Sequence, residues 1–230
     1  MSPRAVVERL DPRNPDDVNA VATLHESLLA GSPLARMGGR FLREYFYSRL
    51  LADGLYDCLV CRADGRIVGF LTYTDRPAEF MSLGLRRHFV SIARIMLASV
   101  VRQPSLIRDL LFVARLMRDR SATPDNGALR NAAEALSLAV SERHQELVPE
   151  GGSTRVAVRL FHEMASDLRK RGGQRVVLHV DPKNRAANLF YSALGCRFYS
   201  TTHAGLTRYL FEYQLQQDGA AVADYETTHK

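Results

Sequence analysis

This sequence of 230 residues has few cysteines, no long uncharged apolar run and no evident cluster of metal-binding side chains. Its three cysteines form an odd, sparse set, which argues against a secreted scaffold held by disulfides. No stretch approaches the roughly 18 apolar residues that a membrane-spanning helix needs. Residues 1–10 contain no apolar core of signal-peptide length, so we expect a cytoplasmic protein.

Two of the cysteines, Cys58 and Cys61, have the C-x-x-C spacing of redox and zinc sites. They lie within an apolar run typical of a strand, whereas redox pairs usually lie at the start of a helix. A zinc site would need a second pair, which is absent, and the seven histidines form no H-x-x-x-H pair. We therefore expect structural cysteines and no metal site.

The composition that is present is that of a globular protein. Hydrophobic residues make up 46% and charged residues 24% of the chain, which excludes a disordered chain. The length suits one α/β domain with an insertion. A net charge of +6 suits a nucleic acid, an anionic membrane surface or a polyanionic cofactor. Because interleaved aromatics and a helix-turn-helix signature are lacking, we expect no nucleic-acid partner.

Local patterns predict alternating strands and helices. Asn14-Pro15-Asp16-Asp17 is typical of a helix start, and Asp64-Gly65 is typical of a hairpin turn. The predicted strands are 5–10, 56–62, 66–74, 133–140, 174–180, 198–202 and 206–215. The predicted helices begin near residues 14, 39, 154 and 186. Residues 79–120 predict a helical insertion of two helices, followed by a loop to 127, and residues 216–230 form a polar tail.

One segment has the pattern of an anion site. The strand Glu134–Val140 leads through a polar loop with Gly151 and Gly152 into a helix from about Thr154. Backbone N–H groups at a helix start, together with the helix dipole, attract phosphate groups. Arg155 adds one cation. By itself this pattern is weak, because many such units bind nothing.

A second segment makes the indication specific. After the predicted strand 174–180, the chain carries Asn184, Ala187, Phe190, Tyr191 and Gly195. This spacing resembles the N-x-x-A-x-x-(aromatic)-Y-x-x-x-G motif of the GNAT acetyltransferases. The run E-A-L-S-L-A-V at 134–140 is similar to the fourth strand of that family. The resemblance covers most of the chain except about 79–127.

The resemblance implies an α/β (α+β) fold, a central mixed sheet of about seven strands flanked by helices, in one domain over residues 1–215. It also implies an acyl-CoA-dependent acetyltransferase that moves the acetyl group of acetyl-CoA directly to a small-molecule amine. The cofactor would lie along the fourth strand and at the following helix start. The implied cofactor-binding residues are Leu138, Ala139, Val140, Gly152, Ser153, Thr154, Arg155, Val156, Ala157, Asn184 and Tyr191.

The loop before that helix departs from the family pattern Q/R-x-x-G-x-G/A. In one alignment Gln145 is the first position and about seven residues are inserted. In the other, residues 152–157 occupy the motif without a gap and Ala157 alone matches. Both alignments put amides 152–157 at the helix start. The missing glycines motivate an alternative function, a non-catalytic acyl-CoA-binding or regulatory domain.

The same resemblance implies catalytic roles. Tyr191 matches the tyrosine that protonates the leaving thiolate, although a packed aromatic beside Phe190 is the structural alternative. Glu134 is the first candidate for the base, and Glu142 and His144 are further candidates.

Ser32, Arg36 and Arg40 are candidates for binding an anionic acceptor, with helix capping and solvated charge as the structural alternative. An amino sugar is one acceptor hypothesis. The insertion carries eight arginines between Arg86 and Arg120. It is open to three interpretations: a lid, a homodimer interface, or peripheral contact with an anionic membrane.

Overall fold

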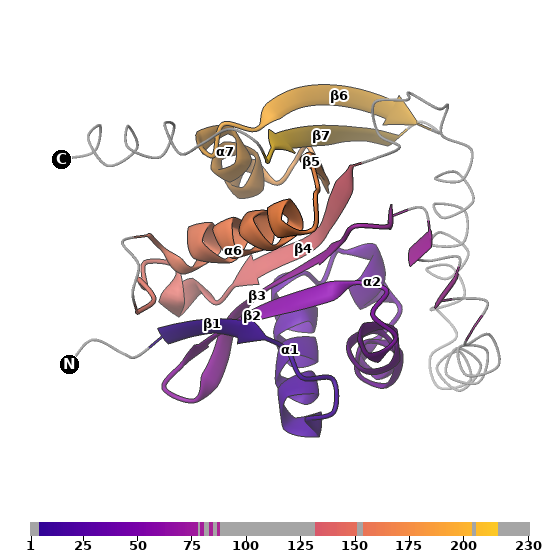
Figure 1. Cartoon of the computed structure of the whole chain (residues 1–230), viewed down its shortest axis with the longest axis vertical. Coiled ribbons are helices and arrows are strands. Elements are labelled where there is room, and N and C mark those ends of the chain that lie inside the picture. Colours follow the sequence, from indigo (N-terminus) through magenta and orange to yellow (C-terminus); the bar gives the residue numbers. More distant parts are fainter. Residues whose placement is uncertain are drawn as a thin grey trace.

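The structure is a computed structural model (Figure 1) that describes residues 5–77, 79–80, 83–84, 87, 132–150, 154–203 and 206–215. Almost all of the predicted helical insertion at 79–120 lies outside the described residues. So do the loop at 121–127 and the tail at 216–230. The predictions for those segments, and the single domain over 1–215, therefore stay predictions.

The described residues form one seven-stranded sheet, as predicted. Its order is β1-β2-β3-β4-β5-β7-β6 (Figure 1), and every pair of neighbours is antiparallel except β4 with β5. The strands are β1 (Ala5–Arg9), β2 (Asp57–Ala63), β3 (Arg66–Thr74), β4 (Ala133–Val140), β5 (Arg175–Val180), β6 (Arg197–His203) and β7 (Leu206–Gln214). The predicted α/β class with a mixed sheet is confirmed.

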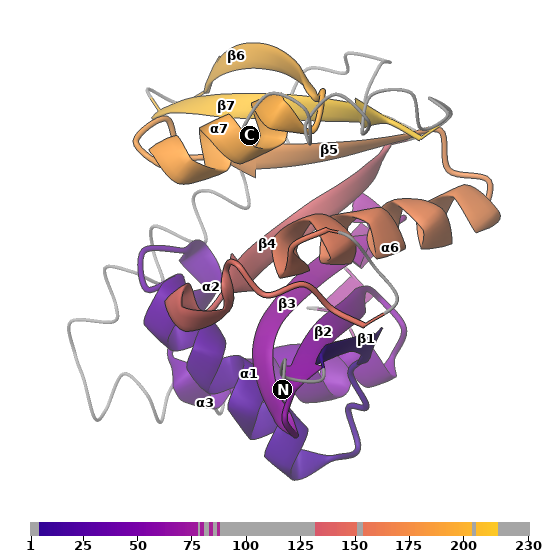
Figure 2. The same cartoon turned by 90° about the vertical axis from the view of Figure 1, so that its left-hand side faces the viewer.

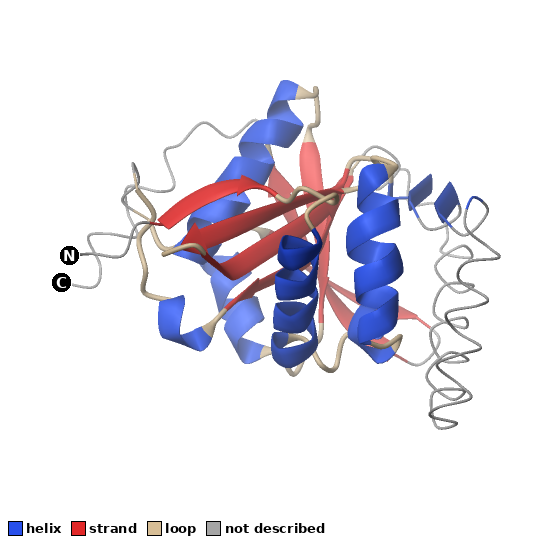
Figure 3. Ribbon diagram, turned by 90° about the horizontal axis from the view of Figure 1, so that it is seen from below, coloured by secondary structure: helices blue, strands red, loops and turns tan. Residues whose placement is uncertain are grey.

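Helices lie against both faces of this sheet (Figure 3). They are α1 (Pro15–Leu28), α2 (Pro33–Arg36), α3 (Gly39–Phe41), η1 (Leu42–Leu50), η2 (Glu142–His144), α6 (Val156–Lys170) and α7 (Arg185–Ala193). Residues of α6 and α7 pack into one hydrophobic cluster, and residues of α1 and η1 pack into another on the opposite face. We call these the α6 face and the α1 face of the sheet.

The local signals in the sequence form as predicted. Asn14 Oδ1 accepts hydrogen bonds from the amides of Asp16 and Asp17, which caps α1. Asp64 and Gly65 have φ of 48° and 78°, the pair of positive values that a type I′ hairpin turn requires. All three cysteines are free and buried, and burial raises the pKa of the Cys61 thiol to about 11.

The helix predicted from residue 39 is present, but most of it is a π-helix and not an α-helix. A short helix, α3, is followed over residues 42–50 by the π-helix η1. Three consecutive aromatics, Tyr45, Phe46 and Tyr47, are buried there. They present an apolar face wider than the stripe of an ordinary amphipathic helix.

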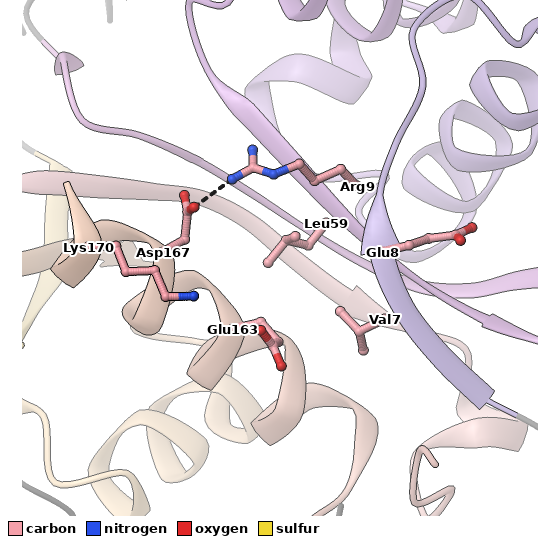
Figure 4. Close-up of a pocket in the computed structure, with 7 residues that line it drawn as sticks. All are labelled: Val7, Glu8, Arg9, Leu59, Glu163, Asp167 and Lys170. Carbon is pink, nitrogen blue, oxygen red and sulfur yellow. Dashed lines mark hydrogen bonds and ion pairs between the residues drawn. The ribbon is translucent and has the colours of Figure 1, made fainter. Parts of the chain in front are cut away.

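An ion-pair network anchors the end of α6 to the sheet. Asp167 accepts hydrogen bonds from Tyr73 Oη of β3 (2.6 Å) and from Arg9 of β1 (2.6 Å), and it pairs with Arg171 at 2.7 Å. Asp57 of β2 pairs with the same two arginines. A surface pocket of about 210 Å³ opens beside this network, between β1 and α6 (Figure 4).

Replacing Asp167 by Asn should lower the free energy of unfolding by roughly 1–3 kcal/mol near neutral pH, because Tyr73 and two arginines lose their charged partner. Burial alone would raise the pKa of Asp167, but the hydrogen bonds from Tyr73 and Arg9 outweigh it and lower that pKa. The carboxylate therefore stabilises the fold above its unfolded pKa of about 4. Its contribution is lost as the pH falls through the lower folded value.

Urea unfolding of wild type and Asp167→Asn near neutral pH and at about pH 2 measures this contribution. We expect the difference between the two proteins to shrink at the acid pH. An equal difference at both pH values would contradict the assignment.

Candidate active site

Among the described strands, the one parallel pair, β4 with β5, opens into a fork. β4 and β5 are paired at Ala133–Val176, Glu134–Val177 and Ala135–Leu178, and the pairing ends there. On its other side β4 stays paired with β3 as far as Val140. Figure 2 shows β4 and β5 together at one end and separated toward the other. The β5 side of residues 136–140 therefore presents backbone groups that no strand of the described sheet satisfies.

The first turn of α6 lies beside the open end of the fork. Among the described residues no side chain caps α6, and its first turn contains no acidic residue, a favourable combination for an anion. Gly69 of β3 allows this position: a Cβ there would lie 3.1 Å from Val140 Cγ2 and 3.2 Å from Val156 Cγ1. The end of β4 and the start of α6 thus both pack against Gly69.

Some of the predicted loop donors have protein partners. The Val156 amide donates to the Leu147 carbonyl at 3.0 Å. The Arg155 guanidinium pairs with Glu146 at 2.6 Å, and both side chains are exposed. Gly152 and Ser153 lie outside the described residues. Of the remaining predicted loop donors, Thr154 and Ala157 are half-buried at the helix start.

Gly69→Val should lower the free energy of unfolding by about 1–3 kcal/mol, because the added methyl groups overlap Val140 and Val156 in a packed layer. Gly31→Val is the matched control, since a Cβ at Gly31 meets no atom within 4 Å. Urea unfolding of both variants measures the difference. Equal stability of Gly69→Val and wild type would show that α6 can shift without cost.

The second motif builds α7 and its two ends. Asn184 Oδ1 accepts from the Ala187 amide at 3.1 Å and caps the helix. At the other end Gly195 has a φ of 77°. The Gly195 amide donates to the Ser192 carbonyl and the Cys196 amide donates to the Tyr191 carbonyl, which is a Schellman motif. In the motif, the asparagine therefore caps the start of α7 and the glycine terminates the helix.

Tyr191 is buried on the α6 face. Its ring contacts those of Phe161, Phe190 and Phe211, with centroids 6.2, 5.1 and 5.8 Å away. Its hydroxyl has no hydrogen-bond partner among the described residues. Burial, with a smaller effect of Cys196, raises its pKa well above the ordinary value, so the phenol keeps its proton. A protonated phenol is the form that a general acid needs.

Glu134 lies on the opposite face from Tyr191. Its neighbours Ala133 and Ala135 pack into the α6 cluster, so strand alternation directs Glu134 to the α1 face. It is 9% exposed and one residue from the last β4–β5 pair. A β-bulge at Thr72/Tyr73 then puts Ser137 on the same face, in register with Thr72. The Thr72 hydroxyl is buried and has no hydrogen-bond partner in the described part of the chain.

The three predicted acceptor residues occupy different settings. Ser32 caps α2 by accepting from the Ala35 amide at 3.1 Å, and it contacts His25 Nε2 at 3.1 Å. Arg40 forms an i,i+4 ion pair with Glu44 at 2.6 Å. Arg36 lies on the last turn of α2 and is exposed. Two hydrogen bonds hold the Ser32 side chain in place at the start of α2.

The other candidates for the base, Glu142 and His144, lie in η2 directly after β4. His144 Nδ1 is buried and has no partner among the described residues. Sequence reasoning missed His25, which is 0% exposed and contacts both Tyr47 and Ser32. Its place on the buried stripe of α1, with Val18, Val21 and Ala22, is the signal that could have found it.

Two further observations concern the described residues only. None of their His, Cys, Asp and Glu side chains gather into a group of three that could hold a metal ion. None of their helices is long and apolar enough to cross a membrane.

The sequence matches no protein-family model and no curated protein, so likeness rests on solved structures. An N-acetyltransferase from Staphylococcus aureus Mu50 is 12% identical, with a TM-score of 0.53, over 93% of this chain and 99% of that one. FeeM, an N-acyl amino acid synthase from uncultured soil microbes, is 14% identical, with a TM-score of 0.51, over 94% and 93%. NAA60 of Arabidopsis thaliana, in complex with acetyl-CoA, is 15% identical, with a TM-score of 0.50, over 91% and 98%. These three and the sheet order show that this chain has the fold of the GNAT acetyltransferases.

Proposed function

We propose that this protein is an acetyltransferase that moves the acetyl group of acetyl-CoA directly to the amine of a small molecule. The observation that carries the proposal is the fork between β4 and β5, with the start of α6, which has no acidic residue in its first turn, at its open end. The fork offers unpaired backbone groups to a pantetheine amide chain, and the helix start offers positive potential to a pyrophosphate. The acetyl-CoA complex of NAA60, on the same fold, supports this choice of co-substrate.

In this proposal Leu138, Ala139 and Val140 bind pantetheine through their backbone. The amides at 152–157 bind the pyrophosphate, and Asn184 fixes the start of α7 beside the cofactor. Because the Val156 amide already bonds to Leu147, the flanking amides carry more of the interaction. Arg155 contributes its charge when it exchanges Glu146, an exposed partner, for phosphate.

Transfer needs two proton movements. The amine nitrogen forms a bond to the acetyl carbon while the carbon–sulfur bond breaks, so the nitrogen loses a proton and the sulfur gains one. Tyr191 is the proposed donor to sulfur, since its raised pKa keeps it protonated. Glu134 is the proposed base, with Glu142 and His144 as the other candidates. Glu134 and Tyr191 lie on opposite faces of the sheet, and the fork is the opening between these faces.

Calorimetric titration with acetyl-CoA, followed by a screen of amines for coenzyme A release, tests the proposal. Micromolar binding with turnover of at least one amine supports it. The screen should include amino sugars, which are one acceptor hypothesis, and amines that carry an anionic group, the kind of acceptor proposed for Ser32, Arg36 and Arg40. Absence of acetyl-CoA binding would reject it.

A non-catalytic acyl-CoA-binding domain is the second candidate. Two observations favour it: the Val156 amide and Arg155 both have protein partners at the helix start. Tight coenzyme A binding without turnover of any amine would support this candidate over the enzyme.

A further inference from the structure

His25 connects two elements of the α1 face through a chain of hydrogen bonds. Its Nδ1 lies 2.7 Å from Tyr47 Oη of η1, and its Nε2 lies 3.1 Å from Ser32 Oγ at the start of α2. Its ring stacks on Phe70 of β3, with centroids 5.4 Å apart. Phe70 in turn pairs with Ala139, on the part of β4 that borders the fork. The His25 ring therefore contacts both the start of α2 and the strand, β3, that pairs with β4 beside the fork.

The direction of these bonds follows from counting protons. Tyr47 is fully buried, and His25 is the only hydrogen-bond partner of its hydroxyl in the described part of the chain. Tyr47 must donate, because its O–H would otherwise be a buried donor without an acceptor. A neutral imidazole has one lone pair and one N–H, and burial lowers the pKa of His25 to about 4, so the ring is neutral. Nδ1 therefore accepts, and Nε2–H donates to Ser32.

The same count leaves one proton on Ser32. Its oxygen accepts from His25 Nε2–H and from the Ala35 amide, which occupies both lone pairs. The hydroxyl hydrogen is then directed away from both donors. Ser32 is partly exposed, and no described residue accepts this hydrogen.

We propose that the Ser32 hydroxyl is a pre-oriented hydrogen-bond donor to an oxygen atom of the acceptor, with His25 and Tyr47 as its positioning residues. This assignment rests on the proposed function and names the acceptor class: a small amine that carries a hydrogen-bonding oxygen. Arg36, one turn further on α2, adds a positive charge that favours an anionic group on the same molecule. The Ser32 hydroxyl is oriented before the acceptor binds. Little binding free energy is therefore lost in ordering it.

The order of the hydrogen bonds can be measured in the unliganded full chain. Long-range ¹⁵N correlation spectra report which ring nitrogen of a histidine carries the proton. We expect His25 Nε2 to be protonated and Nδ1 to be unprotonated, and we expect Tyr47→Phe to remove this preference. A protonated Nδ1 in the wild type would overturn the inference, whatever the activity of the enzyme.

The substrate role is tested with two probes, glucosamine and glucosamine 6-phosphate. Ser32→Asp keeps an acceptor for the Ala35 amide and for His25 but has no proton to donate, whereas Ser32→Thr keeps the hydroxyl. We expect Ser32→Asp to raise the KM of both amines about 10-fold, with less than about a twofold change in the KM for acetyl-CoA. Ser32→Thr should lie within a few-fold of wild type.

The outcomes separate the two proposals. A rise in KM for the phosphorylated probe alone would indicate charge repulsion and would overturn the donor role. Equal KM values in Ser32→Asp and wild type would overturn it as well. Failure of the wild type to acetylate either amine would reject the amino-sugar class and this substrate assignment, whereas the ¹⁵N result stands independently of turnover.

Discussion

Ala157→Asp is expected to weaken acetyl-CoA binding at least about 100-fold, equivalent to about 3 kcal/mol. Ala157 is the second residue of α6, half-buried at the helix start, where the proposed pyrophosphate would lie. A carboxylate there faces the phosphates as a like charge, and such juxtapositions cost several kcal/mol. The same carboxylate interacts favourably with the helix dipole, so the fold should be as stable as wild type or more stable.

Opposite signs for binding and stability make this variant informative. Calorimetry gives the dissociation constant, and urea unfolding gives the stability. Ala157→Asn is the control of equal shape without the charge, and it should bind within a few-fold of wild type. If Ala157→Asp binds acetyl-CoA as tightly as wild type, the pyrophosphate lies elsewhere and the helix start is only structural.

Tyr191→Phe should lower kcat by roughly 10²–10⁴ while the dissociation constant of acetyl-CoA stays within a few-fold. The hydroxyl that is removed has no hydrogen bond to lose among the described residues, and the ring keeps its contacts with Phe161 and Phe211. The loss should therefore appear in the chemical step and not in stability. Single-turnover acetyl transfer separates chemistry from product release.

Tyr213→Phe is the matched control for Tyr191→Phe. Tyr213 packs on the same Phe161, with centroids 5.0 Å apart, and burial raises its pKa as well. Removing the Tyr213 hydroxyl should leave kcat within a few-fold of wild type. Similar kcat values for the two variants would remove the case for Tyr191 as the acid and leave it as a packed aromatic.

The raised pKa of Tyr191 has a second consequence. It guarantees a protonated phenol at neutral pH, but it also makes the phenol a weaker acid toward a thiolate, so part of the driving force is lost. We therefore expect no fall in kcat through deprotonation of this group between about pH 7 and pH 9. A basic limb in that range would come from another residue.

Several helix and hairpin ends follow from residues that are neighbours in the sequence. The Asp64-Gly65 turn, the Asn14 and Asn184 caps and the Gly195 helix end are read from neighbouring residues, because each acts within one turn of backbone. The motif at 184–195 also indicated the fold. Its asparagine and glycine act on the backbone within one turn of α7. For that reason both are found in the structure at the two ends of that helix.

Neighbouring residues do not predict that the helix at 42–50 is a π-helix. The spacing of Phe41, Leu42, Tyr45 and Phe46 is compatible with either an α-helix or a π-helix. The choice is made by packing, since Tyr47 must also reach the core to meet His25. Sequence periodicity does not contain that contact, which joins residues 22 apart.

The face of the sheet on which Glu134 and Ser137 lie depends on strand register. Glu134 and Ser137 are three residues apart, so simple strand alternation puts them on opposite faces. The bulge opposite Thr72/Tyr73 shifts the register by one and puts both on the α1 face. The fork likewise depends on where β5 stops pairing with β4, which neither strand's own sequence specifies. Neighbouring residues fix the local conformation of each segment of the candidate site. Strand register and long-range pairing fix which of these segments lie close together.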